Sequence, residues 1–184
     1  MGLRDAIVEI ANENAGTVTV HDIRRAGYTA DAIRHYVRRH DDVERIAQGV
    51  YEFVDPDNIL TASMSDRYLM SVLRIAGPDS YLAGESVLDF YNLSNANPHK
   101  VLVRSPHRLT RQIPGYMSVE LYPGSEPVDV IRGIRLQGLY NAFLTTKSLQ
   151  THYLLEGIET AANRNLITEH QSLKLKNLIE GGSH

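Results

Sequence analysis

The feature that most constrains the fold is the segment Thr17–Phe53, where an arginine-rich helical pattern precedes two β-rich runs about a Gln48-Gly49 turn. Hydrophobic periodicity and turn residues predict a helix, a short strand, a short helix, a longer helix and a hairpin, at residues 3–12, 17–20, 21–26, 30–40, and 43–47 with 50–54. Gly27 stands at the stop position of the short helix, and Thr29 stands at the N-cap of the longer one. This is the element order of a winged helix-turn-helix domain.

The longer helix, Ala30–His40, has two faces of different chemistry. Four residues at helical spacing predict a stripe that faces the core: Ile33, Tyr36, Val37 and His40. The opposite side carries polar and charged residues: Asp31, Arg34, His35, Arg38 and, at its edge, Arg39. We therefore expect one face to pack on the domain while the other meets solvent or a ligand.

The charge distribution makes DNA a candidate for that ligand. The chain has a formal net charge of −3, yet Arg24–His40 holds five arginines against one acid. A helix is about 10–12 Å across and fits the major groove of B-DNA, which is about 12 Å wide. The planar fork of arginine can grip a phosphate or the edge of guanine. The candidate DNA-binding residues are Thr29, Arg34, His35, Arg38, Arg39, Arg45 and Gln48.

Two observations weigh against this interpretation. A charged helix face is often only a solvated surface. In addition, Asp41, Asp42, Glu44 and Glu52 lie on or just before the hairpin and would repel phosphate unless their side chains turn away.

Length and composition are those of an ordinary globular protein. The 184 residues can form one generous core or two small ones, with 42% hydrophobic and 22% charged residues. The chain has no cysteine, which excludes a disulfide framework and a cysteine-based metal site. It shows no signal-peptide core, and no apolar run approaches the roughly 18 residues of a membrane span. We therefore expect a cytoplasmic protein with no membrane partner.

Turn-forming residues at Asp55–Asn58 mark the expected domain boundary. We expect an α+β protein with a winged helix-turn-helix domain at 1–56, a second domain at 57–180 and a remnant of an expression tag at 181–184. The second domain is expected to combine antiparallel strands with helices, including two at its C-terminal end. Its helices are predicted at 61–75, 83–92, 146–163 and 166–180, and its strands at 100–104, 117–122, 128–131 and 134–137.

A second basic patch is predicted from Lys100, Arg104, Arg108 and Arg111. Strand alternation puts Lys100 and Arg104 on one face, and the loop that follows carries the other two residues. The patch is either a second polyanion-binding face or a charged edge that discourages strand pairing.

The segment "DIRRAGYTADAIRHYVRR…VERIAQGVYEF" resembles the N-terminal module of the AbiEi family, the antitoxins of type IV abortive-infection toxin–antitoxin systems. The matching positions are Asp22, Gly27, Thr29, Arg45 and Gly49-Val50-Tyr51. The stretches "YLAGESVLDFYNLSNANPHKVLVRSPHR" and "IRGIRLQGLYNAFLTT" resemble parts of the family's second domain. The resemblance covers about residues 3–146. Gln48 stands where the family commonly has a basic residue, and His40-Asp41-Asp42 stands where it has glycine.

The resemblance implies a transcriptional repressor that binds inverted repeats in its own promoter. It also implies an antitoxin that counteracts a nucleotidyltransferase-like toxin without forming a stable complex with it. The second domain is implied in the antitoxin role.

Other function classes stay open as alternatives. The chain contains none of the common phosphate-loop, dinucleotide, zinc-protease or serine-hydrolase motifs, so we expect no enzyme, no cofactor and no metal. The first alternative is a winged-helix regulator whose second domain senses a small effector. The second is a nucleic-acid-processing enzyme built on Glu85 and Asp89, which lie four residues apart on one predicted helix.

Overall fold

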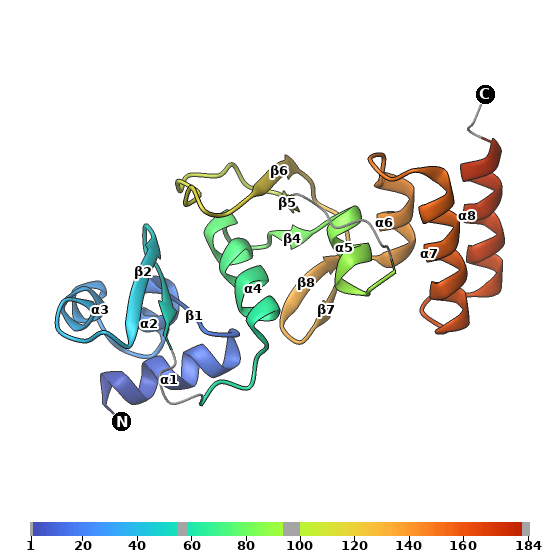
Figure 1. The fold of residues 1–184 in the computed structure, drawn as a ribbon. Coiled ribbons are helices and arrows are strands. Elements are labelled where there is room, and N and C mark those ends of the chain that lie inside the picture. Colours follow the sequence, from blue (N-terminus) through green and yellow to red (C-terminus); the bar gives the residue numbers. More distant parts are fainter. Residues whose placement is uncertain (1, 55–58, 94–99, 182–184) are drawn as a thin grey trace. The chain divides into compact units, whose positions relative to one another are not determined.

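The computed structural model describes residues 2–54, 59–93 and 100–181, and these form a mixed α+β protein (Figure 1). The chain divides into two compact units, each assembled from separate stretches. The first unit comprises Met1–Ser80, His107–Met117 and Arg132–Ile134, and the second comprises Tyr81–Pro106, Ser118–Ile131 and Arg135–His184. The boundary expected at Asp55–Asn58 lies outside the described residues.

The first unit begins with three helices and a three-stranded antiparallel sheet of order β1-β3-β2. The elements are α1 (Leu3–Glu13), β1 (Thr17–Thr19), α2 (Val20–Arg25), α3 (Ala30–Val37), β2 (Val43–Ala47) and β3 (Val50–Phe53). Their order is the one predicted from periodicity. The helices and strands share one core, which contains Ile7, Ile23, Ile33, Val43, Tyr51 and Phe53.

Helix α3 is shorter than predicted, and this changes the environment of His40. The backbone N–H groups of Arg39 and His40 both donate to Tyr36 O, at 2.9 and 3.1 Å, as the chain leaves the helix. Because helical spacing ends at Val37, His40 does not reach the core face. It is exposed and stacks on the Tyr36 ring with centroids 4.1 Å apart. The prediction of His40 as a core residue was wrong.

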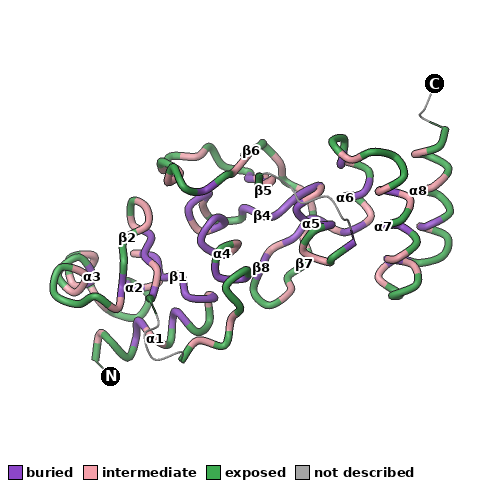
Figure 2. The backbone as a smooth tube through the Cα atoms, viewed as in Figure 1, coloured by how far each residue is buried: buried purple, intermediate pink, exposed green. Residues whose placement is uncertain are grey.

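Helix α4 (Met64–Ala76) packs with the first unit, although the sequence placed it in the second domain. The hydroxyls of Thr17 and Ser71 form a buried hydrogen bond of 3.0 Å between β1 and α4. Arg67 Nη2 donates to Phe53 O of β3 at 2.6 Å. Most of α4 is buried (Figure 2). The reason is that its apolar stripe packs in the unit while α4 also contacts β1 and β3 of the first sheet.

The second unit contains a five-stranded sheet of order β6-β5-β4-β8-β7 and four helices. The strands are β4 (Tyr81–Leu82), β5 (Val101–Ser105), β6 (Val119–Pro123), β7 (Val128–Ile131) and β8 (Ile134–Gln137). The helices are α5 (Glu85–Phe90), α6 (Leu139–Thr145), α7 (Thr151–Asn163) and α8 (Glu169–Gly181).

This sheet is mixed, whereas the sequence predicted antiparallel strands. β5 pairs with β6 and β4 pairs with β8 in parallel, while β4 and β5 are antiparallel. Parallel neighbours need long connections, and strand signals do not reveal which distant strands such connections join. The β7–β8 hairpin is as predicted. Its Arg132-Gly133 turn has φ of 50° and 79°, the two left-handed positions of a type I′ turn.

Candidate nucleic-acid interface

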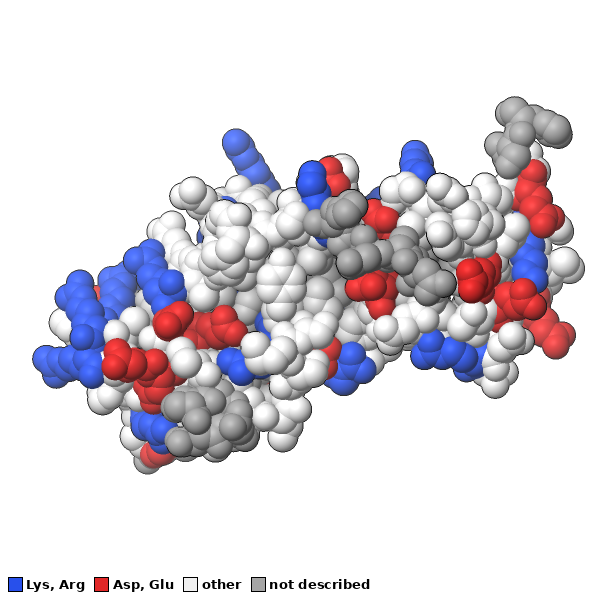
Figure 3. All heavy atoms as spheres, viewed as in Figure 1, with Lys and Arg blue, Asp and Glu red and all other residues white. Residues whose placement is uncertain are grey.

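The side of α3 opposite the core is a surface of exposed cations. Thr29 caps the helix by accepting a hydrogen bond from Ala32 N at 3.2 Å, as predicted. Ile33 is fully buried and holds the helix on the core. The predicted binding residues of this segment are all exposed: Arg34, His35, Arg38 and Arg39. Figure 3 shows arginine side chains gathered around α3 and the neighbouring hairpin.

The charges on this surface are weakly engaged. Arg34 Nη1 lies 2.8 Å from Asp31 Oδ1, but both side chains are more than half exposed. An exposed pair of this kind contributes about 0–1 kcal/mol, so it can be exchanged for another anion at little cost.

The β2–β3 hairpin carries the two other predicted binding residues, Arg45 and Gln48, and both are exposed. Arg45 Nε donates to Ala47 O at 3.2 Å, across an irregularity in the register between these residues. Gly49 forms the turn with φ of 71°, a conformation that favours glycine. The hairpin therefore ends in a polar tip with one cation beside it.

Two of the four acids in this region turn away from the surface. Asp42 accepts hydrogen bonds from Arg4 Nε at 3.2 Å and from the Tyr36 hydroxyl at 2.9 Å. Burial and the Asp42 hydrogen bond raise the pKa of Tyr36 to about 12. Glu52 lies 3.5 Å from Arg67, and burial raises its pKa. Asp41 and Glu44 remain exposed, so part of the expected repulsion persists.

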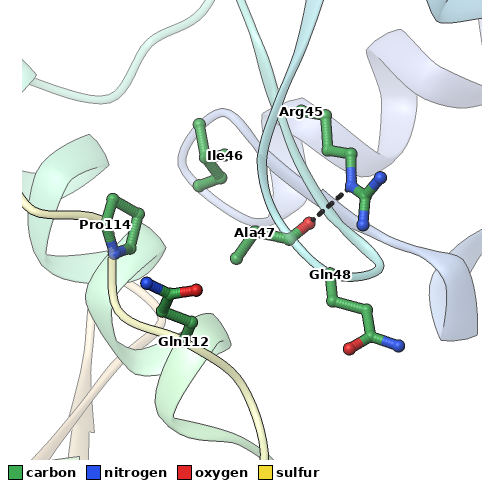
Figure 4. A pocket seen from close by; sticks show the side chains of 6 residues that line it. All are labelled: Arg45, Ile46, Ala47, Gln48, Gln112 and Pro114. Carbon is green, nitrogen blue, oxygen red and sulfur yellow. Dashed lines mark hydrogen bonds between the residues drawn. The ribbon is translucent and has the colours of Figure 1, made fainter.

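A hollow of about 690 Å³ lies beside the hairpin within the first unit. Its lining comes from α3, the hairpin, the start of α2 and the loop that follows β5: Val20, Arg34, Arg45, Gln48, Gly49, Tyr51, Thr110 and Arg111. A second hollow of about 410 Å³ shares Arg45 and Gln48 with it (Figure 4). In that view Gln112 and Pro114 of the loop lie across from Ile46 and Ala47 of the hairpin.

Arg111 is the residue that the sequence did not connect with the hairpin. Its Nε donates to Gln48 O at 3.0 Å, and its Nη1 lies 3.3 and 3.4 Å from the carbonyls of Arg74 and Ile75. The last two carbonyls are at the C-terminal end of α4, where a cation is favoured. Arg111 and Gln48 are 63 residues apart, and no local pattern predicts such a contact.

The predicted second basic patch is divided between the two units. Arg108 and Arg111 belong to the first unit, and Lys100 and Arg104 to the second. Lys100 Nζ lies 3.9 Å from Glu120 Oε1, and Arg104 forms an ion pair with Glu126. Arg108 is exposed.

The two residues of the enzymatic alternative, Glu85 and Asp89, both lie on α5. Glu85 accepts a hydrogen bond from the Ser148 hydroxyl at 2.6 Å, and Asp89 is exposed. Within residues 2–54, 59–93 and 100–181, no group of three or more histidines and acids is placed to hold a metal ion. In the same ranges, no helix has both the length and the apolar character needed to span a membrane.

Comparisons with known proteins give structural neighbours but no family. No family model matches the chain, and no curated protein matches it. The crystal structure of the RV2827C protein from Mycobacterium tuberculosis aligns with a TM-score of 0.46 and 16% sequence identity. The alignment covers 95% of this chain and 80% of that one. A similarity at this level indicates neither a shared family nor a shared function.

Proposed function

We propose that this chain is a DNA-binding transcriptional repressor whose first unit contains a winged helix-turn-helix. In this interpretation α2 and α3 form the helix-turn-helix, α3 enters the major groove, and the β2–β3 hairpin is the wing. The observation that carries the proposal is the outward side of α3 and its C-cap, where Arg34 and Arg38 are exposed while Ile33 is buried.

The chemistry of the surface supports this role. Arginine suits both phosphates and guanine edges, because its planar guanidinium offers two parallel donors. The hairpin is expected to reach the flanking backbone, so Arg45 and Gln48 contact phosphate and Arg38 reads bases. Asp42 is occupied by Arg4 and Tyr36 and therefore opposes DNA less than an exposed carboxylate would.

The identity of the operator and the biological role come from the AbiEi resemblance. We propose that the operator is an inverted repeat in the protein's own promoter. We also propose that the protein is the antitoxin of a type IV system and counteracts a nucleotidyltransferase-like toxin without a stable complex. The second unit is the part assigned to that antitoxin role.

A gel shift with the protein's own upstream DNA tests the first part of the proposal. The wild-type protein is expected to shift this duplex in preference to a scrambled duplex of the same length. Lys174→Ala is a suitable control, because this exposed residue lies on α8 in the other unit. Equal affinity for both duplexes would contradict operator recognition. Co-expression with a nucleotidyltransferase-like toxin tests the antitoxin role separately.

One observation keeps the effector-sensing alternative in view. A hollow of about 300 Å³ in the second unit is lined by polar side chains that include Asp129, Asn141 and Gln171. An effector-controlled regulator would lose or gain operator affinity on addition of its small molecule. The protein can be dialysed against the low-molecular-weight fraction of a cell extract. If its affinity for the operator is the same before and after this dialysis, the result favours the antitoxin role.

A further inference from the structure

Three arginines from distant parts of the chain line a single hollow in the first unit. Arg34 comes from α3, Arg45 from β2, and Arg111 from the loop that follows β5. Gln48 and Thr110 add an amide and a hydroxyl to the lining, and none of its described residues is acidic. Three cations and two neutral polar side chains thus share this space with Val20, Gly49 and Tyr51, and the cations favour a negatively charged ligand.

Arg111 is held in place before any ligand arrives. Three backbone carbonyls accept hydrogen bonds from its Nε and Nη1, and its Nη2 makes no hydrogen bond to a described residue. Carbonyl partners orient a guanidinium and leave its positive charge unneutralised. A carboxylate partner would neutralise that charge. A pre-ordered arginine loses less side-chain entropy when it binds an anion.

The other two arginines can be recruited at small cost. To bind an anion, Arg34 would give up its exposed ion pair with Asp31. Arg45 would give up its hydrogen bond to Ala47 O. The volume of about 690 Å³ exceeds what one inorganic ion needs. It has room for a phosphate with the sugars attached to it.

We propose that this hollow is a phosphate-binding site in which Arg34, Arg45 and Arg111 hold one phosphate group, with DNA backbone as its expected source. This inference rests on the proposed DNA-binding function. It makes Arg111, in the loop that follows β5, a third DNA contact beside α3 and the hairpin. It also assigns Arg111 a role apart from the basic patch predicted from the sequence. A free phosphorylated compound would use the same chemistry, and the experiment distinguishes the two sources.

The test compares Arg111→Gln with Arg108→Gln in the full-length protein. Both remove one positive charge from the same loop, but Arg108 does not line the hollow. Binding to the upstream duplex and to a scrambled duplex is measured by fluorescence anisotropy over a salt series. Arg111→Gln is expected to reduce the slope of log K against log [salt] by about one for both duplexes, the value for one phosphate contact. Arg108→Gln is expected to change the slope less.

A second variant guards against a folding defect, because Arg111 also ties the loop to the hairpin. Thr110 is exposed and lines the hollow. Thr110→Glu is therefore expected to weaken binding to both duplexes while leaving the hydrogen bonds of Arg111 in place. Unchanged slope in Arg111→Gln together with unchanged affinity in Thr110→Glu would overturn the DNA source.

Calorimetry with inorganic phosphate provides the second arm. Phosphate binding that disappears in Arg111→Gln, with an unchanged DNA salt slope, would support the site and assign it to a free phosphorylated compound. Absence of both effects would overturn the site. If the wild-type protein binds no DNA at all, the proposed function fails. The phosphate arm then still decides whether the hollow binds this anion.

Discussion

The basic residues of the two units differ in how their charges are used. At the C-terminal end of α3 and on the hairpin of the first unit, Arg38, Arg39 and Arg45 are exposed and have no carboxylate partner among the described residues. In the second unit, Lys100 just before β5 and Arg104 on β5 each pair with a glutamate of the same unit. The difference teaches that a count of basic residues along a sequence measures potential binding charge and not available charge.

The difference also has an energetic side. A phosphate that approaches Arg38 displaces mainly water. A phosphate that approaches Arg104 competes with Glu126, and both of these side chains are less than one-third exposed. Glu126 also accepts a hydrogen bond from the fully buried Gln137 at 2.5 Å. Separating such a pair leaves a partly desolvated carboxylate. The first unit is therefore the better polyanion surface.

The largest expected effect is the loss of DNA binding when the cations on the outer side of α3 are removed. Arg38→Ala should cost about 1–3 kcal/mol of binding free energy if Arg38 reads a guanine, and the loss should depend on sequence. The double variant Arg34→Ala/Arg38→Ala should lose more. Affinity for the upstream duplex, measured by gel shift, checks both.

Folding must be unchanged for this result to count, and circular dichroism provides the control. A folded double variant that binds the promoter with full affinity would remove α3 from the interface. It would also contradict the inference that the basic residues of the first unit are more available to DNA than those of the second unit.

The next effect concerns stability and uses the paired cation of the second unit. Arg104→Ala removes the partner of the half-buried Glu126, and we expect a loss of about 1–2 kcal/mol in the free energy of unfolding. Lys100→Ala is the matched control, because its exposed pair at 3.9 Å should contribute less than about 0.5 kcal/mol. Urea denaturation measures both values. DNA affinity should be unchanged in both variants. A stable Arg104→Ala protein with weakened DNA binding would show that β5 carries a second polyanion face.

Local features of this fold could be predicted from the sequence because they depend on neighbouring residues. Thr29 caps α3, and Thr168 and Gln171 exchange the two hydrogen bonds of a capping box before α8. Gly27 follows the C-terminal end of α2 with φ of 88°, and the Arg132-Gly133 turn closes a hairpin. Each of these depends on contacts within a few residues, where sequence patterns are informative.

Features that depend on distant contacts could not be predicted. Strand β4 has only two residues, too few for an alternating pattern, and it owes its place to pairing with β5 and β8. The hydrogen bond from Arg111 to Gln48 brings a later loop beside the hairpin. The exposure of the arginines on α3 followed from helical spacing. The third arginine of the phosphate site did not.

A smaller effect is expected at the hairpin. Arg45→Ala should reduce the affinity for all DNA sequences alike and lower the salt slope by about one, because the hairpin is expected to contact backbone phosphate. Anisotropy titrations with the upstream and scrambled duplexes at several salt concentrations check this. A changed sequence preference with an intact salt slope would mean that Arg45 reads bases. The exposed cations of the first unit would then all act in specific recognition.

The smallest effect tests Asp42, an acid beside α3 that is paired as the glutamates of the second unit are. The Tyr36 hydroxyl donates to Asp42, and burial and this carboxylate raise the pKa of Tyr36 to about 12, from a usual value near 10. Because the folded pKa is the higher one, the stabilisation is complete below pH 10 and disappears as the pH rises toward 12.

Tyr36→Phe should therefore cost about 0.5–1 kcal/mol at neutral pH, since the site is only partly buried. It should also reduce the loss of stability between pH 10 and 12. Thermal unfolding of both proteins over this range measures the difference, and parallel curves would contradict the role of the hydrogen bond. DNA affinity should fall only slightly, because Arg4 still holds Asp42 at 3.2 Å and keeps its charge away from the exposed arginines.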